Sequence, residues 1–141
     1  MKVSDCMSRD VRICSPDDSL RDVARKMKET HAGAMPVGTT DRLLGMITDR
    51  DIVVRGLAEG MSPDTPVREA MTCEVRYVFD DEDLDAALAT MSHLKIRRLP
   101  VLNHQRRMVG ILSLRDVWSS EEAVPYAAAA THELAQPSAR T

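Results

Sequence analysis

The chain has 141 residues and a formal net charge of −3, with 22 acidic and 19 basic side chains. Its composition, 43% hydrophobic and 29% charged, is that of a globular protein with one ordinary domain or two very small ones. Aromatic residues make up only 3% of the chain, so a nucleic-acid surface built on stacked rings is not expected. The slight excess of acidic residues also argues against binding to nucleic acids or membranes through concentrated positive charge.

Membrane, disulfide and metal signals are missing from the sequence. No apolar run approaches the roughly 18 residues that a membrane span needs, and no signal sequence opens the chain, so we expect a cytoplasmic protein. The three cysteines, Cys6, Cys14 and Cys73, form no C-x-x-C pair, and the four histidines form no metal-binding pattern. The sequence therefore predicts neither a disulfide framework nor a metal site.

The chain repeats itself at an offset of 64 residues, which becomes 65 after a Pro-Val pair present in each copy. The matches keep the same order along both halves, so each half is expected to form the same series of elements. Matched pairs include Val3 and Val67, Met27 and Met91, Gly45 and Gly110, and Asp51 and Asp116.

Each copy is predicted to form a strand, a helix, two strands and a second helix, after a lead-in turn at Val3–Met7 or Val67–Met71. The first strand is expected at Val11–Cys14 or Val75–Phe79, and an acidic cluster suited to a helix N-terminus follows it. Gly33 is expected to end the first helix. Apolar residues recur along the two helices at the spacing i, i+3, i+4 and i+7: Leu20, Val23, Ala24, Met27 and Leu84, Ala87, Leu88, Met91.

A predicted hairpin and a short helix complete each copy. The hairpin strands are Ala34–Gly38 with Leu43–Ile47, and Arg98–Leu102 with Met108–Leu112; the short helix begins at Asp49 or Leu114. We divide the chain into a first repeat with its lead-in (1–56), a linker (57–66), a second repeat (67–120) and a C-terminal tail of unassigned role (121–141).

One repeat would bury only about 60% of its unfolded surface and would be marginal alone. Two repeats joined by a short linker can pack sheet to sheet about a pseudo-two-fold axis, which creates two equivalent clefts where the copies meet. Such an arrangement favours binding between the copies. No nucleophile–base pair and no Gly-rich phosphate loop is found in the sequence, so we do not expect an enzyme.

Two in-register signatures carry a family resemblance: Gly45-Met46-Ile47-Thr48-Asp49-Arg50-Asp51 and Gly110-Ile111-Leu112-Ser113-Leu114-Arg115-Asp116. Both resemble the G-h-h-[ST]-x-x-D signature, with h apolar, of CBS domains, the regulatory modules named after cystathionine β-synthase. The two lead-ins resemble the V-x-D-x-M opening of that family. The resemblance covers residues 1 to about 120 and implies an α/β (α+β) CBS-domain pair, also called a Bateman module, with two β-α-β-β-α repeats packed through their sheets.

The resemblance also implies a function. CBS pairs are non-catalytic regulatory modules that bind adenosine-containing ligands such as AMP, ADP, ATP, NAD(H) or S-adenosylmethionine between the repeats, as regulatory ligands and not as catalytic cofactors. We accordingly expect a homodimer that acts on an unidentified regulated protein, with neither membrane nor nucleic acid as partner. The alternative is a ligand-free dimeric interaction or stress-response protein, in which the [ST]-x-x-D motifs only cap helices.

The pairs Thr48/Asp51 and Ser113/Asp116 are the candidate ribose and phosphate ligands. Each hydroxyl stands where a strand ends and a helix begins, beside backbone N–H groups that have no partner in the helix and stabilise phosphate. The carboxylate three residues later can accept two hydrogen bonds from the hydroxyls of a ribose. The same spacing is also that of a capping box, and the residues by themselves do not separate the two interpretations.

Neighbouring residues complete the predicted sites. In the family, basic residues at the positions of Arg97 and Arg98 reach ligand phosphates, so we expect both to do so, with a solvated basic edge as the alternative. The first copy has Gly33 and Ala34 instead, so its site should carry less positive charge. The remaining candidates are two arginines that contact phosphate or form surface ion pairs, Arg50 and Arg115, and six residues that border adenine or pack in the core, Ile13, Met35, Pro36, Tyr77, Leu99 and Pro100.

Overall fold

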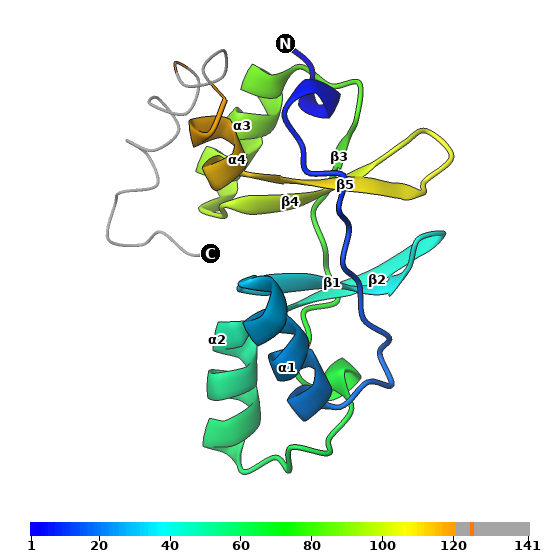
Figure 1. Ribbon diagram of the computed structural model, residues 1–141, viewed down its shortest axis with the longest axis vertical. Helices are drawn as coiled ribbons and strands as arrows, with labels where there is room; N and C mark the ends of the chain where they lie inside the picture. Colours follow the sequence, from blue (N-terminus) through cyan, green and yellow to red (C-terminus); the bar gives the residue numbers. More distant parts are fainter. Residues whose placement is uncertain (121–124, 126–141) are drawn as a thin grey trace. The chain divides into compact units, whose positions relative to one another are not determined.

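A computed structural model describes residues 1–120 and residue 125 (Figure 1). The rest of the predicted tail over 121–141 lies outside the described residues. The chain forms two compact units whose borders differ from those of the sequence repeats. Arg12–Val75 makes up the first-repeat unit, whereas Met1–Val11 and the described residues from Arg76 onward make up the second-repeat unit. None of the helices within the described residues is long and apolar enough to cross a membrane.

The first-repeat unit packs one helix and a helical extension against a two-stranded antiparallel sheet. Ser19 caps the first helix, since its Oγ accepts a hydrogen bond of 3.1 Å from the N–H of Asp22. A β-bulge between Val37 and Gly38 shifts the register of the hairpin. The elements are α1 (Leu20–Thr30), β1 (Ala34–Thr39), β2 (Arg42–Thr48) and α2 (Asp49–Asp51), which continues as a π-helical segment (Ile52–Gly56) and a 3-10 turn (Leu57–Glu59).

The second-repeat unit has the same order of elements around a three-stranded sheet. β3 pairs parallel with β4, and β4 pairs antiparallel with β5 (Figure 1). A β-bulge between Val101 and Leu102 occupies the place of the bulge in the other unit. The elements are β3 (Val78–Phe79), α3 (Leu84–Leu94), β4 (Arg98–Leu102), β5 (Met108–Ser113) and α4 (Leu114–Trp118).

The first strand of each repeat is shorter than the sequence predicted. Of the strand expected at Val11–Cys14, only Cys14 forms a bridge, to Val37, and the strand expected at Val75–Phe79 is reduced to its last two residues. Proline explains the limit, because Pro36 and Pro100 lie in the neighbouring strands and have no N–H to donate to a longer parallel ladder.

The predicted helix end at Gly33 is wrong. α1 ends at Thr30, and His31 follows in the left-handed conformation with φ 55°. Lys95 ends α3 in the same way with φ 59°, so both copies use a non-glycine residue at this cap. The apolar stripe of α1 is also narrower than predicted, because Ala24 is exposed although Leu20, Val23 and Met27 are buried.

The lead-in of the first repeat packs in the unit of the second repeat. The N–H of Val3 donates to the carbonyl of Glu82 at 2.9 Å, and the N–H of Leu84, the first residue of α3, donates to the carbonyl of Met1 at 2.9 Å. The lead-in therefore satisfies a helix N–H group that has no partner within α3. Val3 is 0% exposed and belongs to the core of this unit.

The lead-in of the second repeat makes the equivalent contacts in the unit of the first. The N–H of Val67 donates to the carbonyl of Asp18 at 2.8 Å, and the N–H of Leu20 donates to the carbonyl of Thr65 at 3.0 Å. Val67 is 0% exposed and belongs to the core of that unit. The repeats have thus exchanged their lead-ins: the second-repeat unit is built from two separate stretches of chain, whereas the first-repeat unit is the single stretch Arg12–Val75, which ends with the lead-in of the second repeat.

Gly45 and Gly110, the glycines that open the two signatures, lie where these lead-ins cross the hairpins. A Cβ atom at Gly110 would lie 2.5 Å from Met7 Sδ and 2.8 Å from the Ser8 carbonyl oxygen. At Gly45 the corresponding distance to the Thr72 carbonyl oxygen would be 2.7 Å. Both positions require glycine because a backbone approaches each of them too closely for a side chain.

The exchange predicts that Val3→Ala destabilises the second-repeat unit and Val67→Ala the first-repeat unit. Each substitution removes two buried methyl groups, which costs about 2 kcal/mol of unfolding free energy. In hydrogen–deuterium exchange, Val3→Ala should lower the amide protection of α3 and β5 while α1 and β2 keep theirs, and Val67→Ala should do the reverse. Loss of protection in α1 and β2 with Val3→Ala, or in α3 and β5 with Val67→Ala, would contradict the exchange.

Candidate functional site

In each unit the hairpin brings the start of its first strand next to the start of the following helix. The register pairs Ala34 with Thr48, and Arg98 with Ser113. The N–H of Leu114, the first residue of α4, also donates to the carbonyl of Arg97 at 3.1 Å. The structure therefore places the two arginines predicted to contact phosphate beside the hydroxyl of the second signature.

Thr48 and Asp51 form a complete capping box. The N–H of Asp51 donates to Thr48 Oγ1 at 3.0 Å, and the N–H of Thr48 donates to Asp51 Oδ2 at 3.0 Å. Both residues are half-buried. One carboxylate oxygen of Asp51 is thus engaged by the cap, as the capping interpretation of this motif requires.

Ser113 and Asp116 form only half of that arrangement. The N–H of Asp116 donates to Ser113 Oγ at 3.1 Å, but within the described residues the Asp116 carboxylate does not accept the return bond from the Ser113 N–H. The negative charge of Asp116 also acts on Cys6 of the lead-in. The pKa of the Cys6 thiol is raised chiefly by burial and further by this charge. The two signatures, alike in sequence, therefore use their carboxylates differently.

The other predicted residues are placed as follows. Arg97 is exposed and Arg98 is half-buried at the start of β4, whereas Arg50 and Arg115 are exposed in the first turns of their helices. The first-repeat unit has Gly33 and Ala34 at the positions of Arg97 and Arg98, so this part of the unit carries less positive charge.

Two of the six candidate adenine residues are core side chains. Met35 and Leu99 are 1% and 0% exposed and pack in the cores of their own units. Since side chains alternate along a strand, the adjacent Pro36 and Pro100, which are also buried, lie on the opposite strand faces. The two remaining candidates, Ile13 and Tyr77, are half-buried.

Sequence reasoning missed a cluster that surrounds Tyr77. Its ring contacts Phe79 edge-on with 5.7 Å between centroids, and Phe79 stacks on His104 at 4.6 Å. The imidazole in turn lies 2.6 Å from an Asp81 carboxylate oxygen, and Arg106 donates to the Tyr77 hydroxyl at 3.4 Å. No local sequence signal identifies this cluster, because the β4–β5 turn supplies His104 and Arg106 from more than twenty residues away.

The cysteines differ in environment, and no metal site is formed among the described residues. Cys73 is exposed and Cys14 is buried. Burial chiefly, with a further contribution from the Asp18 charge, raises the pKa of the Cys14 thiol to about 11. Within the part of the chain that the structure describes, no group of three or more His, Cys, Asp and Glu side chains could hold a metal ion.

A family model for the CBS domain matches this chain twice, over residues 3–57 and 62–117. The CBS domain-containing protein YhcV of Bacillus subtilis is 38% identical over 82% of this chain and 81% of its own. Hypoxic response protein 1 of Mycobacterium tuberculosis is 36% identical over 80% of each chain.

Solved structures agree with these matches. A crystal structure of Hypoxic Response Protein I with two coordinated zinc ions has a TM-score of 0.76 at 35% identity, and the match covers 84% of this chain and 98% of that one. The CBS domain pair of protein MJ0100, solved with 5′-methylthioadenosine and S-adenosyl-L-methionine, has a TM-score of 0.74 at 27% identity and covers 84% of this chain and 94% of that one.

The thiol environments predict that Cys73 reacts first with a disulfide reagent under mildly alkaline conditions. The pKa of about 11 for Cys14, against an ordinary 9.0, leaves about 100-fold less of the reactive thiolate, and burial slows its reaction further. Labelling followed by peptide mass spectrometry measures the three rates, and labelling in urea provides the unfolded control. Equal rates for Cys14 and Cys73 in the folded protein would contradict the burial of Cys14.

Proposed function

This chain belongs to the CBS-domain family, and from that premise we propose that it is a non-catalytic sensor that binds adenosine-containing ligands at its two [ST]-x-x-D helix starts. The observation that carries the proposal is the carboxylate of Asp116, which lies in the first turn of α4 beside Ser113 and is not engaged in capping its own helix. A carboxylate in this position suits the paired hydroxyls of a ribose.

Arg97 and Arg98 suggest which ligand the second-repeat site prefers. Arg98 pairs in register with Ser113, so this arginine and the hydroxyl of the second signature lie on adjacent strands of one sheet. Guanidinium groups match the planar geometry of phosphate oxygens, which supports AMP, ADP or ATP at this site.

The first-repeat site has a different balance of charge. Thr48 and Asp51 lie beside Gly33 and Ala34, with no arginine in place of the second-repeat pair. This site suits a ligand without phosphate, such as a nucleoside or S-adenosylmethionine. The complex of the MJ0100 CBS pair with 5′-methylthioadenosine and S-adenosyl-L-methionine supports this ligand class.

The sensor is proposed to act as a homodimer on a separate protein. A ligand-free interaction protein is the second candidate, and the complete capping box of Thr48 and Asp51 favours it for the first repeat. A thermal-shift series with AMP, ATP, NADH and S-adenosylmethionine separates the two functions, because a ligand that binds the folded state must raise its stability. A melting temperature unmoved by all four at millimolar concentration would favour the ligand-free protein.

Asp116→Ala should weaken AMP binding at least about tenfold in isothermal titration calorimetry, since charge-assisted hydrogen bonds to the ribose are lost. Because this carboxylate is not part of the cap, the free energy of unfolding should change by less than about 0.5 kcal/mol. The matched control is Asp85→Ala, which removes an exposed carboxylate from the first turn of α3. Unchanged affinity together with lower stability would identify Asp116 as a structural residue.

The double variant Arg97→Gly/Arg98→Ala gives the second-repeat site the residues of the first. It should lower the affinity for AMP about tenfold or more, while the affinity for adenosine stays within about twofold. Arg76→Ala/Arg107→Ala removes two exposed arginines elsewhere in the same unit and controls for net charge. Equal losses for AMP and adenosine would show that the arginines do not contact phosphate.

A further inference from the structure

The lead-in of the second repeat pairs with β2 next to the first signature. The N–H groups of Met46 and Thr72 each donate to the carbonyl of the other residue at 2.9 Å. This bridge lies two residues before Thr48, the last residue of β2. The lead-in therefore runs beside the end of the strand that carries Thr48 to the first-repeat site.

Arg55 fastens this lead-in to the helical segment that carries Asp51. Its Nη1 donates to the carbonyls of Ala70 and Met71 at 3.4 and 3.3 Å, and to Thr72 Oγ1 at 3.4 Å. The three acceptors belong to three consecutive residues, so one guanidinium group spans the stretch of the lead-in that crosses β2.

Arg55 and Asp51 lie one turn apart on the same helical segment. α2 ends at Asp51 and continues directly as the π-helical stretch Ile52–Gly56. Residues four positions apart are neighbours on a helix surface, so the arginine and the carboxylate share one side of the segment. A contact that holds Arg55 therefore also holds the turn that carries Asp51.

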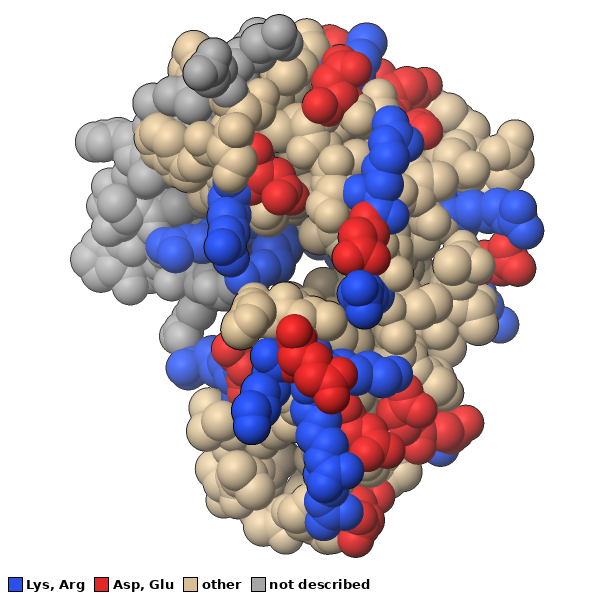
Figure 2. Space-filling view, viewed as in Figure 1, with Lys and Arg blue, Asp and Glu red and all other residues tan. Residues whose placement is uncertain are grey.

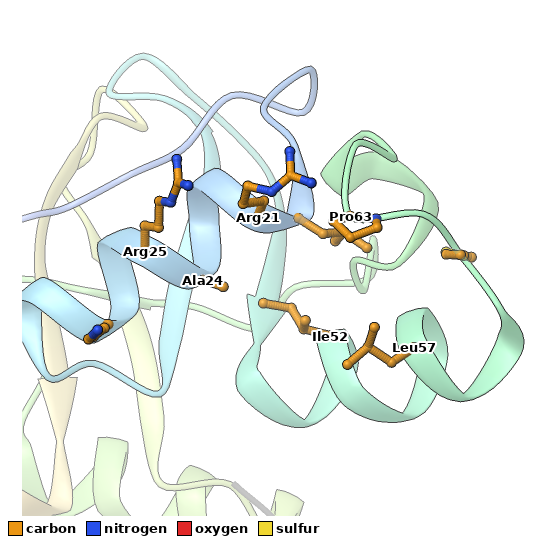
Figure 3. A pocket seen from close by; sticks show the side chains of 9 residues that line it. Arg21, Ala24, Arg25, Ile52, Leu57 and Pro63 are labelled. Atoms are coloured by element: carbon orange, nitrogen blue, oxygen red, sulfur yellow. The ribbon is translucent and has the colours of Figure 1, made fainter.

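Another side of the segment packs towards α1. Figure 3 shows Ile52 and Leu57 on the wall of an apolar groove that separates the segment from α1. Gly56 is buried on this side, and a Cβ atom there would lie 3.1 Å from Leu20 Cδ1. The segment thus has two neighbours, α1 and, through Arg55, the lead-in of the second repeat.

Arg55 differs from the other cations of the first-repeat unit in its partners. Figure 2 shows Lys and Arg beside Asp and Glu over this face of the unit, and the ion pairs include Arg21 with Asp64 at 2.6 Å and Lys26 with Asp18 at 3.5 Å. Within the described residues, the hydrogen bonds of Arg55 go only to the lead-in. A surface ion pair therefore does not account for this arginine.

The second-repeat unit makes the same crossing without an arginine. Ser8 and Ile111 exchange hydrogen bonds of 2.8 and 2.9 Å, but at the offset of 65 the residue in place of Arg55 is Ser120. The crossing itself therefore does not require the arginine. The capping boxes differ in parallel, since among the described residues the return bond from the carboxylate forms only in the unit that has Arg55.

We infer that Arg55 is a positioning residue of the first-repeat ligand site: it holds the turn that carries Asp51 against the lead-in and so fixes the carboxylate beside Thr48. The inference rests on the proposed function of this site. The cap engages Oδ2 of Asp51, and a carboxylate has about four acceptor positions, so a fixed Asp51 can still accept hydrogen bonds from a ribose. A site held in place binds more tightly, because less conformational freedom is lost on binding.

The test measures each site separately in the full chain by isothermal titration calorimetry. Asp116→Ala leaves the first-repeat site, which is titrated with S-adenosylmethionine, and Asp51→Ala leaves the second-repeat site, which is titrated with AMP. Adding Arg55→Ala should lower the S-adenosylmethionine affinity of the first protein about tenfold, because the site is less well positioned. It should change the AMP affinity of the second protein by less than about twofold.

Two further variants in the Asp116→Ala protein control for charge and for folding. Arg55→Lys should keep the affinity within about threefold of the parent protein, because an ammonium group can donate to the same carbonyls. Arg42→Ala removes an exposed arginine from the opposite end of β2 and should change the affinity by less than about twofold. Arg55 is also exposed, so its variants should fold, and circular dichroism checks this.

Three results would overturn the inference. The first is an S-adenosylmethionine affinity that Arg55→Ala changes by less than about twofold. The second is an equal loss of affinity for S-adenosylmethionine and for AMP, which would show a general loosening of the fold. The third is no binding of S-adenosylmethionine to the Asp116→Ala protein; AMP binding to the Asp51→Ala protein would then show that the proposed function holds for the second repeat alone.

Discussion

The exchange of lead-in segments is the constraint on which the rest of the structure depends. Val3, from the lead-in of the first repeat, completes the core of the second-repeat unit, and Val67, from the lead-in of the second repeat, completes the core of the first-repeat unit. Carbonyl groups of the same two stretches of chain accept hydrogen bonds from the first N–H groups of α3 and α1. The segments then cross the hairpins at Gly45 and Gly110, where a Cβ atom has no room. The glycine of each signature is therefore explained by packing of the chain on itself, independently of any ligand.

The residues after each glycine show how one motif can serve two purposes. A hydroxyl at the helix start accepts the N–H three residues later in both units. The carboxylate completes the cap only in the first repeat, so Asp51 stabilises the start of its own helix, whereas within the described residues Asp116 does not accept the return bond. The first-repeat helix is also the one that continues into the groove wall, because Ile52 directly follows Asp51. The end of the first signature and one wall of the groove thus belong to one continuous helical segment.

The sequence by itself determined the repeat, the order of the main elements and the family. Matched residues at a constant offset, the apolar stripe of α3 and the two signatures are local or periodic features, and the CBS-domain fold that they predicted is confirmed by the family and structure matches. Capping was an open alternative at this stage, because the spacing from Thr48 to Asp51 is the same for a cap and for a ribose site.

Only the tertiary structure decided the features that depend on contacts between distant segments. It assigned each lead-in to the opposite unit, placed Met35 and Leu99 in the cores, and separated the roles of Asp51 and Asp116. It also ended α1 at Thr30 and not at Gly33, with His31 as the left-handed cap, because this conformation is open to residues other than glycine at modest cost. Sequence periodicity shows which face of an element is apolar, but it does not show which distant segment covers that face. The contacts between distant segments could therefore be assigned only from the tertiary structure.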